Sequence, residues 1–93
     1  RYYQAQLHGK VVGGCYVSLF EDVPTLLGVY TLPEARRNGV ATAMLTRAVE
    51  DSIRTGHQTC CLFVKHGNPA EHLYRQLGFV PLVDEQTYVW HSW

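Results

Sequence analysis

The sequence predicts an α+β domain in which one β-sheet is covered by two helices. Two observations indicate strands and helices: polar and apolar residues alternate on both sides of an early turn, and apolar residues recur at helical spacing in the middle of the chain. A third observation sets the size, because 93 residues that are 46% hydrophobic and 17% charged suffice for one compact domain with a modest core. We find no internal repeat, linker or low-complexity tract.

The first third of the chain predicts a hairpin followed by a third strand. Residues 2–8 form the first strand, Gly9-Lys10 supplies the turn, and residues 11–20 form the second strand. The segment Glu21-Asp22-Val23-Pro24 interrupts the pattern, and a third strand follows over 26–32.

The rest of the chain predicts two helices between strands. The first helix begins near Val40 and stops at Gly56, with its apolar stripe at Val40, Met44, Leu45, Ala48, Val49 and Ile53. A buried strand over 58–65, a short helix over 70–77 and a strand pair over 79–83 and 86–90 complete the chain.

The loop between the third strand and the first helix predicts a site for a pyrophosphate. The first backbone N–H groups of a helix lack internal partners and lie at its positive end, so they bind anions. The main chain is accessible there because Gly39, Val40, Ala41 and Thr42 have small or neutral side chains, and Arg36 and Arg37 add positive charge. The alternative is that Asn38 caps an ordinary helix and both arginines are solvated.

Several other functions are disfavoured. The sequence contains neither the P-loop spacing of NTPases nor the glycine pattern of dinucleotide-binding folds. Eight basic and eight acidic residues give no net charge, which argues against nucleic-acid and anionic membrane partners. The five histidines and three cysteines show no metal-ligand or disulfide spacing. No apolar run would span a bilayer, so we expect a protein of the reducing cytoplasm with no metal and no membrane contact.

Two segments of the chain resemble motifs of the Gcn5-related N-acetyltransferase (GNAT) family. Arg36-Arg37-Asn38-Gly39-Val40-Ala41 resembles motif A, Gln/Arg-x-x-Gly-x-Gly/Ala, and Pro33-Glu34 before it also fits. The segment from Asn68 to Phe79, with Leu73-Tyr74 and Gly78-Phe79, resembles motif B. The last segment, 80–90, is similar to the closing strand pair of the family, so the resemblance covers about the last two thirds of the chain.

The resemblance implies an acetyltransferase-like fold with a mixed, largely antiparallel central sheet and two helices. The family places a strand and two helices before the hairpin that opens this chain. Residues 1–93 therefore resemble a single truncated GNAT domain, the carboxy-terminal part of an acetyltransferase. The exposed flank of the first strand would then favour a homodimer or a partner domain.

The resemblance also implies an activity, the transfer of acetyl from acetyl-CoA to a primary amine by direct attack. Tyr74 matches the family tyrosine that acts as general acid for the departing thiolate. The residues that would bind the cofactor are Val29, Tyr30 and Thr31 through their main chain, and Arg36, Arg37, Asn38, Gly39, Val40, Ala41 and Thr42 in motif A.

Four points stay open at this stage. Asn68 stands one residue later than the cofactor-contacting asparagine of the family, so we favour a helix cap, with Pro69 at the first helical position and Glu71 completing a capping box. Tyr74 could instead only pack on the sheet. The general base is not identified among Glu34, His66 and His72, of which His66 is the least poor candidate. The rival function is a noncatalytic CoA-binding or dimerisation module.

Overall fold

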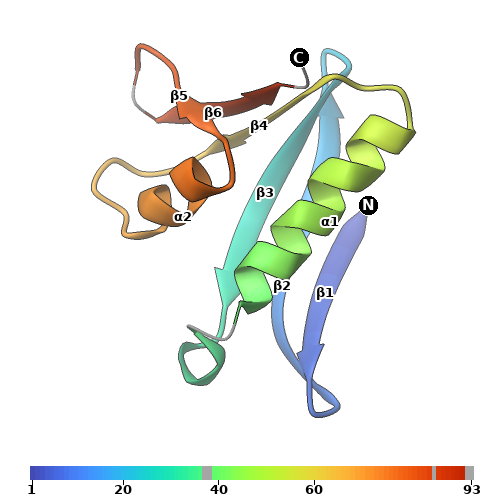
Figure 1. Cartoon of the computed structure of the whole chain (residues 1–93), viewed down its shortest axis with the longest axis vertical. Coiled ribbons are helices and arrows are strands. Elements are labelled where there is room, and N and C mark those ends of the chain that lie inside the picture. The colour runs from blue at the N-terminus through green and yellow to red at the C-terminus, as the bar shows by residue number, and fades with distance from the viewer. Residues whose placement is uncertain (37–38, 85, 92–93) are drawn as a thin grey trace.

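A mixed sheet of six strands carries two helices in the computed structural model, which describes residues 1–36, 39–84 and 86–91. The strand order is β1-β2-β3-β4-β6-β5, and only β3 and β4 run parallel (Figure 1). The predicted fold class is confirmed. The elements are β1 (Tyr2–Leu7), β2 (Lys10–Phe20), β3 (Val23–Thr31), a 3₁₀ turn (Pro33–Ala35), α1 (Val40–Arg54), β4 (Thr59–Phe63), α2 (Ala70–Gln76), β5 (Val80–Pro81) and β6 (Thr87–His91).

The two hairpin turns differ from their predicted positions. Lys10 pairs with Leu7 at the start of β2, so the first turn is formed by His8 and Gly9, not by Gly9-Lys10. The expected four-residue interruption shrinks to a two-residue turn at Glu21 and Asp22, and β3 starts three residues earlier than predicted. All four turn residues have positive φ, the geometry of tight hairpins that follow the twist of their strands.

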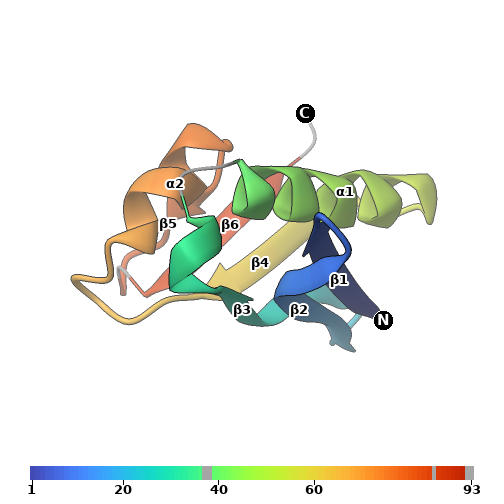
Figure 2. The same ribbon diagram turned by 90° about the horizontal axis from the view of Figure 1, so that it is seen from below.

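Both helices pack on the same face of the sheet (Figure 2). The core beneath them combines Leu45 of α1 and Tyr74 of α2 with inward-facing residues of the central strands. Its largest fully buried side chains include Tyr88, Phe79, Leu26, Leu45 and Leu62. The opposite face of the sheet, which we call the helix-free face, carries no helix from the described residues.

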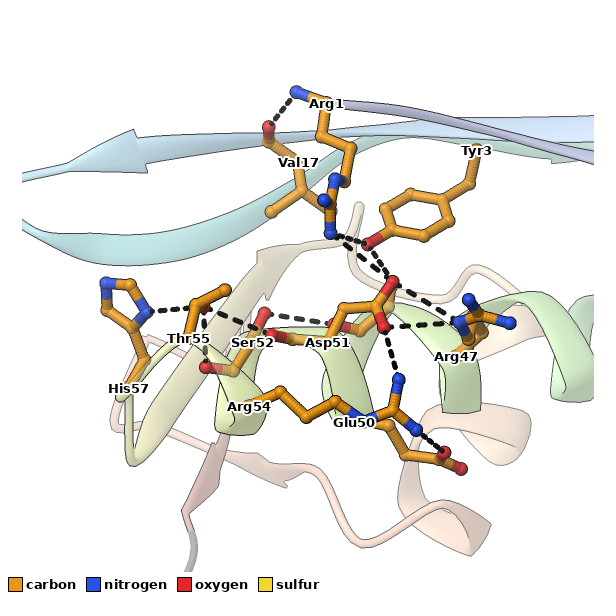
Figure 3. A network of polar contacts seen from close by, with 11 residues as sticks. Arg1, Tyr3, Val17, Arg47, Glu50, Asp51, Ser52, Arg54, Thr55 and His57 are labelled. Atoms are coloured by element: carbon orange, nitrogen blue, oxygen red, sulfur yellow. Dashed lines mark hydrogen bonds and ion pairs between the residues drawn. The ribbon is translucent and has the colours of Figure 1, made fainter.

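The edge strand β1 is attached to α1 by a polar network centred on Asp51 (Figure 3). The Asp51 carboxylate, whose side chain is only 12% exposed, accepts a hydrogen bond of 2.8 Å from the Tyr3 hydroxyl. Arg47 and Arg54 of the same helix and Arg1 before β1 also donate to it at 3.2–3.4 Å. One carboxylate therefore holds the strand, the helix and the start of the chain together.

In the part of the chain that the structure describes, no helix is both long enough and apolar enough to cross a bilayer.

We predict that Asp51 makes stability depend on pH in the acidic range. The Tyr3 hydrogen bond, helped by Arg47 and Arg1, lowers the pKa of Asp51. A carboxylate with a lowered folded pKa contributes stability above its unfolded pKa, about 3.9, and loses it as pH falls through the folded pKa. Asp51→Asn should therefore lower the urea midpoint at pH 7 and flatten its decline below pH 4.

The matched control is Glu50→Gln on the same helix, because Glu50 is exposed and its ion pair with the exposed Arg54 is longer, at 3.8 Å. Its curve of midpoint against pH should follow the wild type. Parallel curves for Asp51→Asn and the wild type would contradict the assignment.

Candidate functional site

The parallel strands β3 and β4 separate soon after they meet (Figure 1). They pair only at Thr25 with Cys61 and Leu26 with Leu62. Beyond this point, among the residues that the structure describes, 29–31 of β3 have no strand partner on the side that faces β4. The sheet thus splits in the middle and leaves the backbone of residues 29–31 without a strand partner on this edge.

A β-bulge in β3 accompanies this separation. Tyr16 of β2 pairs with Leu27, whereas Gly14 pairs with Tyr30, so two residues of β3 lie opposite Cys15 alone. The first of the two, Gly28, has φ +61, a conformation that costs glycine little and other residues more. Because a bulge bends its strand and increases the local twist, it redirects the end of β3 away from β4.

A cleft of about 650 Å³ lies where the two strands have separated. It brings together ten of the twelve predicted site residues, while the other two, Arg37 and Asn38, fall outside the described residues. Four residues at the cleft were not predicted. Its walls are formed by Val29, Tyr30, Thr31, Ala35, Arg36, Gly39, Val40, Ala41, Thr42, Asn68, Pro69, Ala70, Leu73 and Tyr74.

A sequence signal existed for the missed residues of α2. Ala70, Leu73 and Tyr74 are spaced three and four apart, which places them on one side of a helix. If Tyr74 lines the cleft, Ala70 and Leu73 on the same side of the helix are expected to line it too. Ala35 had no such signal, because its burial, at 1% exposure, depends on how the 3₁₀ turn packs.

The amino terminus of α1 forms one end of the cleft. Gly39 precedes the helix with φ +72, and a Cβ atom at this position would meet nothing within 4 Å. The glycine therefore serves the backbone conformation, and the space in front of it is open. The first turn contains no acidic side chain, so the positive end of this 15-residue helix is not neutralised locally.

Arg36 places a cation beside this helix end. Its Nε donates a hydrogen bond of 3.2 Å to the carbonyl oxygen of Thr31, which holds the side chain against the end of β3. A guanidinium carries five N–H donors in a planar arrangement, so this bond leaves others for an anion. The helix end and Arg36 together can bind a phosphate group.

The other end of the cleft is formed by Tyr74 of α2. Its ring is buried and packs edge-on against Phe79 and Tyr88, with 6.3 Å between ring centroids in both cases. Its hydroxyl makes no hydrogen bond to any residue that the structure describes. Since no fully buried side-chain polar atom among those residues lacks a partner, this hydroxyl reaches the open space of the cleft.

The protonation state of Tyr74 follows from its surroundings. Burial, and to a smaller extent the nearby Cys15, raise the pKa of its phenol. The hydroxyl is therefore protonated at neutral pH and can donate a proton or a hydrogen bond into the cleft.

The loop before α2 is held by Asn68 and Glu71. The Asn68 Oδ1 accepts a hydrogen bond of 2.8 Å from the Ala70 amide, and Asn68 also lines the cleft. The N-cap of α2 is Pro69, one residue later than predicted, and it has no side-chain cap. The predicted capping box is wrong. Because the helix begins at Ala70, the Glu71 carboxylate reaches further back and accepts from the Gly67 amide at 3.2 Å and from the Tyr88 hydroxyl at 2.9 Å.

The three candidate general bases do not line the cleft. Glu34 bonds to the Lys10 ammonium group at 2.9 Å, and this contact lowers its pKa. His72 contacts the Gln76 side chain at 3.2 Å on the exposed side of α2. His66, the least poor of the three candidates, also lies outside the cleft walls.

The three cysteines are free thiols. Burial raises the pKa of Cys15 to about 11, so this thiol is neutral and a poor nucleophile. Over 1–36, 39–84 and 86–91, no group of three or more histidine, cysteine, aspartate or glutamate residues is placed to hold a metal ion.

Comparison with known proteins gives a family and a shared fold. The model of the acetyltransferase (GNAT) domain matches residues 1–81. A search of curated proteins gave no match.

Three solved structures illustrate the shared fold. The ribosomal-protein-S18-alanine N-acetyltransferase of Escherichia coli is 24% identical with a TM-score of 0.79, over 96% of this chain and 65% of that one. The PaiA N-acetyltransferase of Thermoplasma acidophilum, in complex with coenzyme A, is 20% identical with a TM-score of 0.82, over 95% and 57%. A structure assigned as a streptothricin acetyltransferase of Bacillus anthracis, in complex with acetyl coenzyme A, is 18% identical with a TM-score of 0.84, over 97% and 61%.

The chain thus spans 57–65% of the length of these three proteins. At such identities the likeness shows the fold, and the family follows from the match of the domain model. Since that match covers most of the chain and the architecture agrees with it, the chain belongs to the GNAT acetyltransferase family.

Proposed function

We propose that this chain carries the cofactor-binding and catalytic part of an N-acetyltransferase, which moves acetyl from acetyl-CoA to a primary amine by direct transfer. The observation that carries the proposal is the cleft itself. It joins a positive helix end, an open strand edge and the hydroxyl of Tyr74, whose ring is buried and whose hydroxyl has no partner among the described residues. Family membership and the coenzyme complexes of two structural neighbours support it.

The phosphate end of acetyl-CoA fits the amino terminus of α1. The backbone N–H groups of the first helical turn, from Val40 to Thr42, would bind the pyrophosphate together with Arg36. Gly39 keeps the approach to the main chain open. Arg37 and Asn38, which belong to the same sequence motif, lie outside the described residues and stay predicted contacts.

The pantetheine arm and the thioester fit the free edge of β3. Residues 29–31 would bind the arm through backbone hydrogen bonds, in the manner of an added strand. A backbone N–H at this edge would also stabilise the negative charge that develops on the thioester carbonyl oxygen. One preorganised donor of this kind is worth about 3 kcal/mol of barrier.

Tyr74 would complete the transfer as general acid. The amine nitrogen forms a bond to the acetyl carbon, the carbon–sulfur bond breaks, and the Tyr74 hydroxyl gives its proton to the departing sulfur. The amine loses a proton to solvent, and the Tyr74 phenolate takes one back from solvent, so that the enzyme returns to its starting state. Tyr74 can fill this role because its phenol is held neutral by burial.

The rival function is a noncatalytic CoA-binding or dimerisation module. One observation favours it, because none of the three candidate bases lines the cleft. The two functions predict different roles for the Tyr74 hydroxyl. It acts as a general acid in acetyl transfer, and it has no role in the noncatalytic module.

We also propose a cytoplasmic location and an association through β1. The three free thiols suit a reducing compartment. Strand β1 lies at the edge of the sheet, with a pairing partner only in β2 among the described strands, and such an edge favours a second chain or domain.

We predict that the 93-residue chain sediments as a dimer at micromolar concentrations, because its free strand edge and exposed aromatic residues gain by pairing. Analytical ultracentrifugation measures this directly. A monomeric mass over the whole concentration range would remove the homodimer and leave a partner domain as the occupant of that edge.

We predict that Gly39→Glu weakens acetyl-CoA binding by about tenfold or more, because a carboxylate opposes the anion at the positive helix end, an effect on the order of 1–2 kcal/mol. Isothermal titration calorimetry gives the Kd. The control is Gly9→Glu, which imposes the same strained positive φ in a hairpin turn that does not line the cleft. Equal Kd values for both variants and the wild type would place the phosphate elsewhere.

We predict that Tyr74→Phe lowers kcat by about 10²- to 10⁴-fold, the usual contribution of a general acid. The Kd for acetyl-CoA should stay within about twofold, because the ring and its packing remain. Thiol release gives kcat and calorimetry gives Kd. Tyr3→Phe is the matched control, since its hydroxyl serves the Asp51 network. Unchanged turnover in Tyr74→Phe would exclude the hydroxyl from catalysis.

A further inference from the structure

One carboxylate on α2 connects three parts of the structure near Tyr74. The Glu71 Oε1 atom accepts a hydrogen bond of 2.9 Å from the Tyr88 hydroxyl, and its Oε2 atom accepts one of 3.2 Å from the Gly67 amide. Tyr88 belongs to β6, and Gly67 belongs to the loop that joins β4 to α2. Glu71 therefore attaches the helix both to the sheet and to the loop that precedes the helix.

Tyr88 is a firm anchor for this attachment. It is fully buried, and its neighbours in the sheet are Leu62 of β4 and Pro81 of β5. Burial, followed by the contact with Glu71, raises the pKa of its phenol, so the hydroxyl stays protonated at neutral pH and remains a donor. The Arg75 guanidinium, also from α2, lies 5.5 Å from the centroid of the same ring and adds a cation–π contact.

The helix needs such attachments because it is short. Its seven residues form about two turns, and helices of this length are not stable on their own. Its N-cap residue, Pro69, provides no side-chain hydrogen bond. Tertiary contacts therefore set the position of α2. The two bonds to the Glu71 carboxylate suit this role, because hydrogen bonds to a charged acceptor are about twice as strong as neutral ones.

The side of the cleft that carries Tyr74 is formed by this attached segment. Five of the residues that line the cleft fall within 68–74, and Glu71 is not one of them. Tyr74 follows Glu71 by one turn, and its ring packs edge-on against the Tyr88 ring, with 6.3 Å between centroids. Because Tyr88 contacts both residues, a shift of Glu71 relative to β6 would also move the Tyr74 hydroxyl.

We propose that Glu71 is a positioning residue for the acetyl transfer. By fixing α2 to Tyr88 and to Gly67, it holds the Tyr74 hydroxyl at the place in the cleft where a departing thiolate takes up its proton. This inference rests on the proposed function, in which Tyr74 is the general acid. Glu71 acts through Tyr74, so its contribution to the rate is the geometry of proton transfer.

The test is a double-mutant cycle of Glu71→Ala with Tyr74→Phe, with kcat measured by thiol release. Glu71→Ala alone should lower kcat by about 10- to 100-fold, because a misplacement of about 1 Å costs up to about 10²-fold. In the Tyr74→Phe background, the same change should alter kcat by no more than about twofold, because the hydroxyl that Glu71 positions is absent. An equal loss in both backgrounds would indicate a merely structural role and would overturn the inference.

Three further variants keep the test independent of a folding defect in Glu71→Ala. Tyr88→Phe retains the buried ring and removes one of the two bonds to Glu71, so it should reproduce part of the kcat loss. Glu71→Gln should restore most of the activity, because its amide can accept from Gly67 and donate to the Tyr88 hydroxyl oxygen. Gln76→Ala, at an exposed position of the same helix, should match the wild type. Full activity in both Glu71→Ala and Tyr88→Phe would contradict the proposal.

NMR separates this inference from the proposed function. A wild-type chain that releases no thiol with any amine would contradict acetyl transfer, and the Tyr74 ring would then decide the role of Glu71. In chains with isotope-labelled tyrosine, the ring signals of Tyr74 and its NOE to the Tyr88 ring should persist in Glu71→Gln and change in Glu71→Ala. Unchanged ring signals and NOE in Glu71→Ala would show that Glu71 does not position Tyr74.

Discussion

The separation of β3 from β4 is the constraint on which the rest of the site depends. A continuous parallel pair would satisfy the backbone of 29–31 within the sheet and would leave no room between α1 and α2. Because pairing stops at Leu26 and Leu62, the same backbone has no strand partner on this edge, and the two helices stand at opposite ends of one cleft. The cost is a pair of open strand edges inside the molecule, which a strand-like ligand would satisfy.

The helices give the two ends of the cleft different chemistry. The long helix α1 directs its positive end and Arg36 toward one end, where an anion is favoured. The short helix α2 contributes Tyr74, a neutral phenol surrounded by aromatic rings. Tyr88 of β6 stabilises this second end. Its ring packs on Tyr74, and its hydroxyl donates a hydrogen bond to Glu71, which lies one turn before Tyr74 in α2. In the proposed function, anion binding and proton donation would therefore take place at opposite ends of the cleft.

Local features of the sequence predicted much of this arrangement. Apolar periodicity identified α1, and two motifs identified both helix-borne parts of the cleft, because these signals lie within short segments. The bulge at Gly28 was not predicted, since it depends on the register of 14–16 against 27–30. The turn positions were wrong because His8, Glu21 and Asp22 adopt positive φ without being glycine. Glu34 was a candidate base because its ion pair cannot be seen from the local sequence. Its partner Lys10 lies 24 residues away.

The most direct test of the account is amide hydrogen exchange, measured by NMR with and without acetyl-CoA. The central claim is that the free edge of β3 binds the pantetheine arm through its backbone. Amides within 29–31 should then become protected on addition of acetyl-CoA, together with those at the start of α1. Protection at α1 without any change in 29–31 would show that the separated strands do not bind the arm, and would contradict the account.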